Sequence, residues 1–109
     1  MLNQIVVCGR ISSISAKKLD GKEVQEVVIA APRSYKNADG EYDTDFIPFI
    51  LTGGIASNTL EYCKTGDIVG IKGSIRSLES KDGKHPFYLS AEKVSFLSSK
   101  APSTDEEED

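Results

Sequence analysis

The chain has 109 residues, of which 39% are hydrophobic and 28% are charged. This length predicts a single domain with a modest core, and no apolar run is long enough to span a membrane. The formal net charge is −4, but the last five residues are all acidic, so residues 1–104 hold 13 basic and 12 acidic side chains. We therefore expect a near-neutral folded domain, residues 1–97, followed by a disordered acidic tail, residues 98–109.

The residue types that metal binding and catalysis require are scarce. There is one histidine, His85, and the two cysteines, Cys8 and Cys63, lie far apart and outside any CxxC motif. We expect both thiols to be reduced and buried. The chain shows no metal-ligand cluster, no Ser/His/Asp spacing and no phosphate-cradling glycine motif, so the sequence predicts no metal, no cofactor and no enzyme.

Five apolar, β-prone segments alternate with turn residues. The first, residues 3–15, contains Ile5-Val6-Val7-Cys8, which is apolar on both faces and favours either a subunit contact or cover by loops of the same chain. In chain order we expect strands over residues 3–15, 23–31, 44–52, 67–80 and 85–97, with one short α-helix over residues 55–64 between the third and fourth strands. This order predicts an all-β protein, a five-stranded Greek-key barrel of the oligonucleotide/oligosaccharide-binding type (the OB-fold).

A polar turn is predicted between the second and third strands. Asn37, Asp39 and Gly40 tolerate positive φ, so residues 37–40 are expected to turn and the apolar flanks to pair as a hairpin. Arg33, Tyr35 and Lys36 lie where the chain enters this turn, and Phe46 lies where it leaves. Two rings with two cations beside the first suit flat, negatively charged ligands, and single-stranded nucleic acid is the obvious candidate.

Both rings also have a simpler interpretation. Tyr35 fits a loop residue that half-covers the barrel, and Phe46 fits core packing at the start of a strand. Strand alternation places Phe46 on the face opposite Ile47, Phe49 and Leu51. If those three side chains fill the barrel, Phe46 points outward and can stack on a base.

Glycine and proline mark interruptions in the strands. Gly9 predicts a bend or a close backbone approach in the first strand, and Gly70 and Gly73 predict sharp coiling of the fourth. Pro48 has no N–H to donate, which predicts an edge or a bulge in the third strand. Residues 81–84 (Lys-Asp-Gly-Lys) predict a hairpin turn before the fifth strand.

Six basic residues fall on the loops and strands expected near the two rings. A lysine or arginine on a strand often only solvates its face, but a set beside exposed rings suits phosphate contacts. The acidic residues at 39, 41, 43 and 45 would repel DNA, so the loop tip is expected to point away or the binding to be unusually salt-sensitive. The candidate phosphate contacts are Arg33, Lys36, Lys72, Arg76, Lys81 and Lys84.

Four segments in register resemble bacterial single-stranded DNA-binding proteins, and the resemblance extends over residues 1–97. They are residues 1–11 (MLNQIVVCGRI), residues 36–41 followed by 44–47, residues 60–69, and residues 71–76. The resemblance implies a homotetramer of barrels, a dimer of dimers formed through the first strand, with single-stranded DNA wrapped around it. It also implies a cytoplasmic, nucleoid-associated protein without catalytic chemistry.

The resemblance assigns roles to particular residues. Tyr35 and Phe46 match aromatic residues on which bases stack, and Arg76 matches a basic residue near the DNA path. Thr52 and Ser80 stand where many relatives have aromatic residues, and the chain has no tryptophan. Phe87 and Tyr88, across the last hairpin, are expected to substitute in part. The acidic tail ends in Glu108-Asp109 and lacks the family's hydrophobic tip, which docks on replication and repair proteins.

We therefore expect sequence-nonspecific binding and protection of single-stranded DNA in replication, recombination or repair. Two alternatives remain open. One is an accessory replication protein on the same barrel, such as a primosome component or a plasmid or phage variant, that acts mainly through protein contacts. The other is an oligomerisation module whose groove binds nothing, which the small net charge allows.

Overall fold

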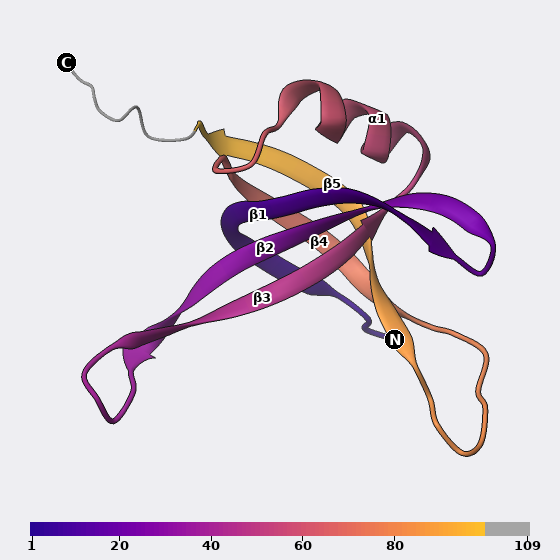
Figure 1. Ribbon diagram of the computed structural model, residues 1–109, viewed down its shortest axis with the longest axis horizontal. Coiled ribbons are helices and arrows are strands. Elements are labelled where there is room, and N and C mark those ends of the chain that lie inside the picture. The colour runs from indigo at the N-terminus through magenta and orange to yellow at the C-terminus, as the bar shows by residue number, and fades with distance from the viewer. Residues whose placement is uncertain (100–109) are drawn as a thin grey trace.

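The computed structural model describes residues 1–99 of the chain. The elements are β1 (Ile5–Leu19), β2 (Lys22–Lys36), β3 (Tyr42–Leu51), α1 (Gly53–Tyr62), β4 (Ile68–Ser77) and β5 (Phe87–Ser98). The strands pair in the order β1-β2-β3-β5-β4 and close into a barrel (Figure 1). The predicted five-stranded OB-fold with one helix between the third and fourth strands is confirmed. The predicted disordered tail lies outside the described residues from residue 100 onward.

Closure of the barrel depends on the length and curvature of β1. Residues 5–10 of this strand pair with β4, and residues 10–19 pair with β2, both antiparallel. The register with β2 shifts between Ile11 and Ser13, and such an irregularity increases the local bend of a strand. Gly9 sits just before it, where an added Cβ would lie 2.5 Å from the carbonyl oxygen of Ala30. The predicted close backbone approach at Gly9 is therefore confirmed.

The core fills the barrel from every strand. Val27 and Ile29 of β2 alternate inward with Phe49 and Leu51 of β3, and each of these four side chains is at most 1% exposed. The remaining fully buried large side chains come from β1 and β4 and are Ile11, Val69 and Ile71. The interior is thus a packed apolar core, which leaves ligand binding to the outer face of the sheet.

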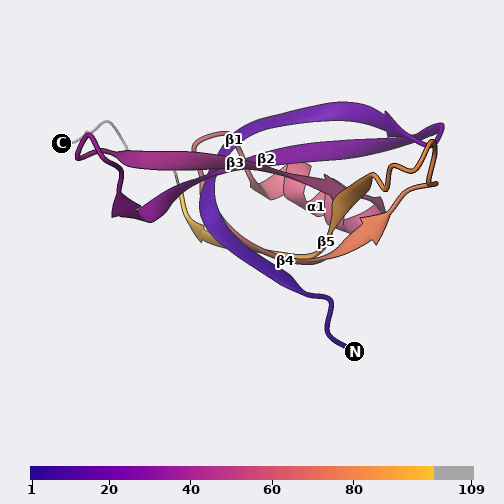
Figure 2. The same ribbon diagram turned by 90° about the horizontal axis from the view of Figure 1, so that it is seen from below.

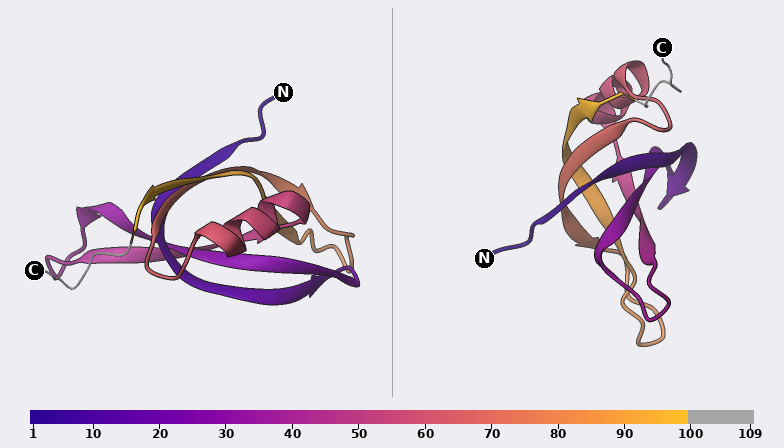
Figure 3. Two further views of the ribbon diagram at one scale, coloured as in Figure 1. Left: turned by 90° about the horizontal axis from the view of Figure 1, so that it is seen from above. Right: turned by 90° about the vertical axis from the view of Figure 1, so that its left-hand side faces the viewer.

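Helix α1 lies across one open end of the ring of strands (Figure 3). Ile55 and Ala56 pack against the barrel core, and Cys63, which follows the helix, is 6% exposed. Burial raises the pKa of the Cys63 thiol, and the nearby negative charge of Asp67 raises it further. The helix begins two residues earlier than the sequence predicted, at Gly53, whose φ of 58° marks the turn out of β3. Among the described residues no helix has the length and apolar character that crossing a membrane requires.

The three hairpin connections extend toward opposite ends of the molecule. The β1–β2 and β4–β5 connections lie at one end, and the β2–β3 connection lies at the other (Figures 1 and 2). The β1–β2 turn is Asp20-Gly21, both with positive φ, and the β4–β5 tip is Asp82-Gly83, also both with positive φ. The predicted hairpin turn at residues 81–84 is confirmed by paired backbone hydrogen bonds between Lys81 and Lys84.

Two hairpins are longer than the sequence predicted. The first strand was expected to end at residue 15, yet β1 continues to Leu19 because cross-strand partners from β2 remain available up to the Asp20-Gly21 turn. The second strand was expected to end at Ala31, before Pro32, yet β2 continues to Lys36. The register with β3 shifts between Pro32 and Lys36, and this irregularity accommodates a residue that has no N–H to donate.

Pro48 also lies where no backbone N–H is needed for a hydrogen bond to a neighbouring strand. It pairs with Val28 of β2 on one side, while β3 contacts β5 only through the single Ile50–Ser90 pair. The other side of Pro48 therefore faces no strand, which confirms the predicted edge position.

One prediction about burial is wrong. Cys63 is buried as expected, but Cys8 is exposed, and its neighbour on the same face, Val6, is 61% exposed. Ile5 and Val7 point to the barrel interior and pack against the core, so alternation turns Val6 and Cys8 outward. No loop among the described residues covers this outer face of β1.

The close approach of β4 to β5 gives a test of the fold. A Cβ added at Gly73 would overlap the carbonyl oxygen of Ser90, whereas one added at Gly70 would meet the Cys8 sulfur at an ordinary 3.4 Å. Because a strand backbone cannot yield as a side chain can, we expect Gly73→Ala to lower the free energy of unfolding by about 1–3 kcal/mol. Gly70→Ala, in the same strand, should change it little. Urea unfolding of both variants measures the difference, and equal stabilities would contradict the packing described.

Candidate nucleic-acid interface

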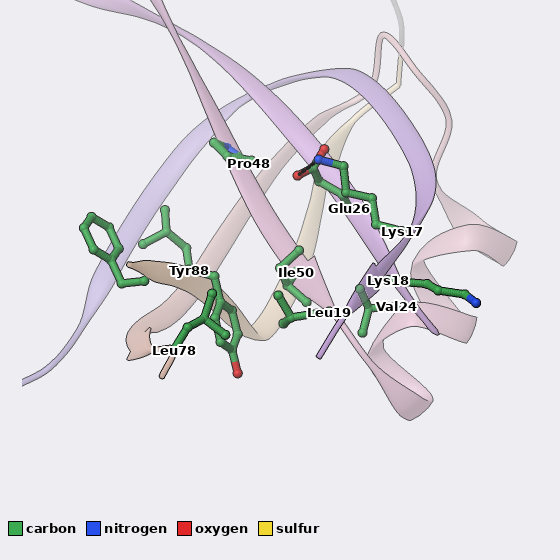
Figure 4. A pocket seen from close by; sticks show the side chains of 11 residues that line it. Lys17, Lys18, Leu19, Val24, Glu26, Pro48, Ile50, Leu78 and Tyr88 are labelled. Atoms are coloured by element: carbon green, nitrogen blue, oxygen red, sulfur yellow. Dashed lines mark ion pairs between the residues drawn. The ribbon is translucent and has the colours of Figure 1, made fainter. Parts of the chain in front are cut away.

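A groove of about 360 Å³ lies on the outer face of β2 and β3. Val24 and Glu26 of β2 and Pro48 and Ile50 of β3 line its floor, and they share one face because Glu26 pairs with Ile50 and Val28 with Pro48. The β1–β2 hairpin forms one wall and the β4–β5 hairpin forms the other (Figure 4). We call this feature the hairpin groove. It has the position that OB-folds use for ligands, over the β2–β3 face and between these two connections.

The walls of the hairpin groove are mostly apolar. Leu19 reaches over the floor from the β1–β2 hairpin, and Leu78 and Tyr88 come from the opposite side (Figure 4). Phe87, also in the lining, is 63% exposed. The β4–β5 hairpin thus presents two aromatic residues to the groove. Their substitution for the missing stacking residues stays a prediction.

One ion pair lies inside this apolar surface. The Lys17 Nζ is 3.1 Å from the Glu26 Oε2, and the Glu26 side chain is only 16% exposed. The two residues are diagonal neighbours across the β1–β2 ladder, since Lys17 pairs with Val24 and Ser15 pairs with Glu26. Figure 4 shows the pair at the edge of the groove, while Lys18 points away from the other labelled side chains.

Phe46 extends the apolar floor along β3. Its side chain is 61% exposed, and it lies on the same face as Pro48 and Ile50 because alternate residues of a strand share a face. Ile47, on the opposite face, packs against the core. The structure therefore rejects the alternative that Phe46 is a core residue and leaves its ring available for stacking.

Arg33 lies on the other face of the β2–β3 ribbon. Its Nε and Nη2 donate hydrogen bonds to the Asp45 carboxylate at 3.0–3.3 Å, and its Nη1 lies 3.8 Å from Asp43. The hydrogen bonds with Asp45 raise the pKa of Arg33, and the same hydrogen bonds hold the pKa of Asp45 below its ordinary value. Asp45 alternates with Phe46, so Arg33 and Phe46 face opposite ways. The predicted cation beside the rings is thus engaged with two acids of its own hairpin.

The remaining residues of the β2–β3 hairpin are held by local contacts. Tyr35, 64% exposed, lies close enough to Arg33 to contribute to the raised pKa of the guanidinium. The Lys36 ammonium sits 5.9 Å from the ring centroid of Tyr42, which is within the range of a cation–π contact. The Asn37 side chain accepts hydrogen bonds from the backbone N–H groups of Asp39 and Glu41. This Asn-based turn confirms the predicted loop at residues 37–40.

The candidate residues of β4 and β5 separate into two groups. Arg76 pairs with Tyr88 across the strands, so the two side chains share a face. Lys72 instead pairs with Val6 of β1 and Lys93 of β5, on the outer face of that part of the barrel. Lys72 is not among the residues that line the hairpin groove, so only Arg76 of these two cations accompanies an aromatic groove residue.

The sequence prediction therefore mixed residues from several surfaces. Tyr88 lines the hairpin groove, Phe46 continues its floor, and Lys81 and Lys84 form the tip of its β4–β5 wall. The groove residues missed from sequence include Lys17, Glu26 and Ile50. A usable signal was present: Lys17 and Lys18 precede an Asp-Gly dipeptide flanked by β-prone runs, which is a strong hairpin indicator.

Within residues 1–99, no group of three or more His, Cys, Asp or Glu side chains is arranged to hold a metal ion. The groove offers instead aromatic rings, apolar walls and isolated hydrogen-bonding groups. These features suit a flat, partly apolar ligand at the face that OB-folds use for binding.

Comparison with known families identifies the chain. The model of the single-strand binding protein family matches residues 2–97, so the chain belongs to this family. Single-stranded DNA-binding protein B of Bacillus subtilis is 34% identical over 106 residues, which cover 92% of this chain and 94% of that protein. Single-stranded DNA-binding protein 1 of Clostridium acetobutylicum is 32% identical over 106 residues, which cover 91% of this chain and 96% of that protein.

Solved structures support the same fold at lower sequence identity. The Plasmodium falciparum SSB in complex with ssDNA superimposes with a TM-score of 0.65 at 22% identity, covering 89% of this chain and 96% of that one. A deletion mutant of the single-stranded DNA-binding protein from Thermus aquaticus gives a TM-score of 0.65 at 18% identity, covering 88% of this chain and 50% of that one.

The Arg33–Asp45 pair can be tested by titration. Because the pKa of Asp45 is lowered in the folded state, the pair contributes stability above the ordinary pKa of Asp, and this contribution is lost as the pH falls through the lowered pKa. We expect the Asp45 carboxyl carbon to titrate by NMR below the ordinary value of 3.8. In Arg33→Gln the midpoint should move up toward that value. An Asp45 midpoint that is the same in both proteins would contradict the pairing.

Proposed function

We propose that this protein binds single-stranded DNA on the outer face of β2 and β3, with little dependence on sequence, and that it coats and protects the strand in replication, recombination or repair. The observation that carries the proposal is the apolar track of Phe46, Pro48 and Ile50, which continues from an exposed ring into the hairpin groove. Family membership supports it, since the family is named for binding single strands and not for a reaction. The relatives' names support it in the same way.

Stacking supplies the larger share of the affinity in this proposal. Each base stacked on an aromatic side chain contributes about 1–3 kcal/mol, and every base has a face that can stack, so such contacts tolerate any sequence. Phe46, Phe87 and Tyr88 provide rings along the groove, and Tyr35 provides one at the far hairpin. Bases inside a duplex cannot reach these rings, so double-stranded DNA should bind poorly.

Phosphate contacts supply a smaller share. Lys17 and Lys18 line the groove itself. Of the cations predicted from sequence, Lys81 and Lys84 lie at the β4–β5 tip and Arg76 lies beside Tyr88. Lys36 beside Tyr42 and Lys72 on the outer face of β4 extend the set along adjoining surfaces. Arg33 contributes once a phosphate displaces Asp45 from its guanidinium. For each phosphate that the protein neutralises, the logarithm of the association constant falls by about 0.7 for every tenfold rise in salt concentration.

Two variants with matched exposure test this proposal. Phe46→Ala removes a ring that is 61% exposed beside the groove, and Tyr62→Ala removes one that is 68% exposed on α1. We expect Phe46→Ala to weaken binding of an oligo(dT) of about 35 nucleotides by about 1–3 kcal/mol, and Tyr62→Ala to leave it unchanged. Fluorescence anisotropy at two salt concentrations measures both effects. Equal losses of oligo(dT) affinity in the two variants would place the binding surface elsewhere. A wild type that fails to bind oligo(dT) at low salt would favour the alternative of an accessory replication protein that acts through protein contacts.

We also propose that the protein assembles through β1 into dimers and then into a homotetramer. Val6 and Cys8 form an exposed outer face, and residues 5–9 pair only with β4. Their second edge therefore presents backbone N–H and C=O groups that another strand can pair with. Joining several barrels would place their grooves in one track, which compensates for the near-neutral charge of each domain.

The assembly has its own test. Val6→Lys places a charge on the outer face of β1, while Leu60→Lys places one on α1, where Leu60 is 49% exposed. Sedimentation velocity should give four times the mass of one chain for the wild type and for Leu60→Lys, and a smaller species for Val6→Lys. A wild-type mass equal to one chain would contradict the assembly.

The acidic segment at residues 105–109 lies outside the described residues, and its recruitment of replication and repair proteins stays a prediction. A cytoplasmic, nucleoid-associated location is part of the same proposal, because that is where single-stranded DNA arises during bacterial replication. The relatives with the matches given above are bacterial proteins.

A further inference from the structure

The hairpin groove contains one feature that general single-strand binding does not require. Its lining is apolar or aromatic except for the two hairpin lysines and Glu26, and Glu26 is held by Lys17 at 3.1 Å with a side chain only 16% exposed. A largely buried carboxylate is costly unless it is paired and hydrogen-bonded. A carboxylate also repels phosphate, so its presence in a DNA-binding groove restricts which part of the strand can lie there.

The group that faces Glu26 must donate hydrogen bonds. An ionised carboxylate only accepts, with about four lone-pair directions, so Oε2 can accept from Lys17 and still leave Oε1 free. Phosphate and sugar-ring oxygens only accept, whereas the edges of the bases carry N–H donors. The backbone of a bound strand therefore runs along the rim of the groove, and a base edge points toward Glu26.

The size of the groove fits a single base. Its volume of about 360 Å³ lies at the lower end of the roughly 300–1,000 Å³ that small-molecule sites occupy. Tyr88 comes from the β4–β5 wall and Leu19 from the β1–β2 wall (Figure 4), so a base seated in the groove has an aromatic and an aliphatic side chain to pack against. This position is separate from Phe46, which stacks a base further along β3.

We infer that the hairpin groove seats one unpaired base per protomer and that Lys17 and Glu26 read its Watson–Crick edge, which favours guanine and disfavours thymine. The inference rests on the proposed function. Guanine presents the O6 acceptor next to the N1–H and N2–H₂ donors, which match an ammonium beside a carboxylate. Thymine presents one N–H between two carbonyl oxygens and has no amino group, so one of its oxygens would face the carboxylate.

Cytosine and adenine fall between these two bases. Each offers one amino group for Glu26 and one ring nitrogen that can accept from Lys17, whereas guanine offers two donors to the carboxylate. The preference acts at one base per protomer, so stacking and phosphate contacts elsewhere remain insensitive to sequence. The protein would therefore bind strands of any sequence but prefer positions along a strand that place a guanine in the hairpin groove.

The test compares oligonucleotides that differ at one base. One is an oligo(dT) of about 12 nucleotides, within the roughly 4–16 nucleotides that an OB-fold covers, and the other carries a single guanosine at its centre. A base-specific pair of this kind discriminates by about 1–3 kcal/mol, so we expect the guanosine oligonucleotide to bind about 5- to 150-fold more tightly to the wild type. Equal affinities would overturn the inference.

Two variants that remove the same charge locate the effect. Glu26→Gln keeps the shape of the side chain but replaces one acceptor with a donor, and it should abolish the guanosine preference. Glu23→Gln, on the same hairpin but outside the groove, should keep the preference. An ion pair that only stabilised the hairpin would alter the unfolding midpoint of Glu26→Gln and not its base preference, so a preference unchanged in Glu26→Gln would overturn the inference.

A further oligonucleotide needs no variant protein. Replacing the guanosine with inosine removes the N2 amino group and keeps O6 and N1–H, so affinity for the wild type should fall to between those of the guanosine and thymidine oligonucleotides. If the inosine and guanosine oligonucleotides bound equally tightly, the N2 amino group would have no role as a second hydrogen-bond donor to Glu26. Failure to bind any of these oligonucleotides would refute the proposed function itself, whereas binding without base preference would refute only this inference.

Discussion

The structure depends on a single strand, β1, that pairs with two neighbours along its length. Pairing with β4 through its first half and with β2 through its second closes the barrel, and the strands can meet only where backbones approach closely. Gly9 and Gly73 occupy two such places, where a Cβ would strike a carbonyl oxygen of the neighbouring strand. Closure fixes the angle between the β1–β2 and β4–β5 hairpins, and these hairpins form the two walls of the groove.

Three basic side chains near the β1–β2 and β2–β3 hairpins are engaged by neighbours of the same chain. Arg33 is held by Asp45, Lys17 by Glu26, and Lys36 lies over Tyr42. These pairs reduce the positive potential that a polyanion meets, in keeping with a domain whose basic and acidic residues nearly balance. Recognition in this account therefore depends more on rings and apolar surface than on net charge, and paired groups become available when DNA displaces their partners.

The sequence predicted those features that local pattern controls. Alternation identified Ile47, Phe49 and Leu51 as inward-facing, so the outward direction of Phe46 followed. The Asn-Ala-Asp-Gly and Lys-Asp-Gly-Lys segments located the β2–β3 and β4–β5 hairpins. It did not predict the partners of charged residues, because these depend on register across strands. Asp45 meets Arg33 only because β2 continues past Pro32, and Glu26 meets Lys17 only because β1 continues to Leu19. Cys8 is exposed because alternation turns it outward beside Val6, whereas its residue type alone favours burial.

The central claim is that single-stranded DNA lies on the outer face of β2 and β3. The most direct measurement is an NMR titration of ¹⁵N-labelled protein with oligo(dT), followed at each backbone amide. The account predicts the largest shifts at Glu26, Phe46 and Ile50 and along the β4–β5 hairpin, with little change at Asn58 and Tyr62 on α1. Shifts concentrated on α1, with the β2–β3 face unchanged, would contradict it.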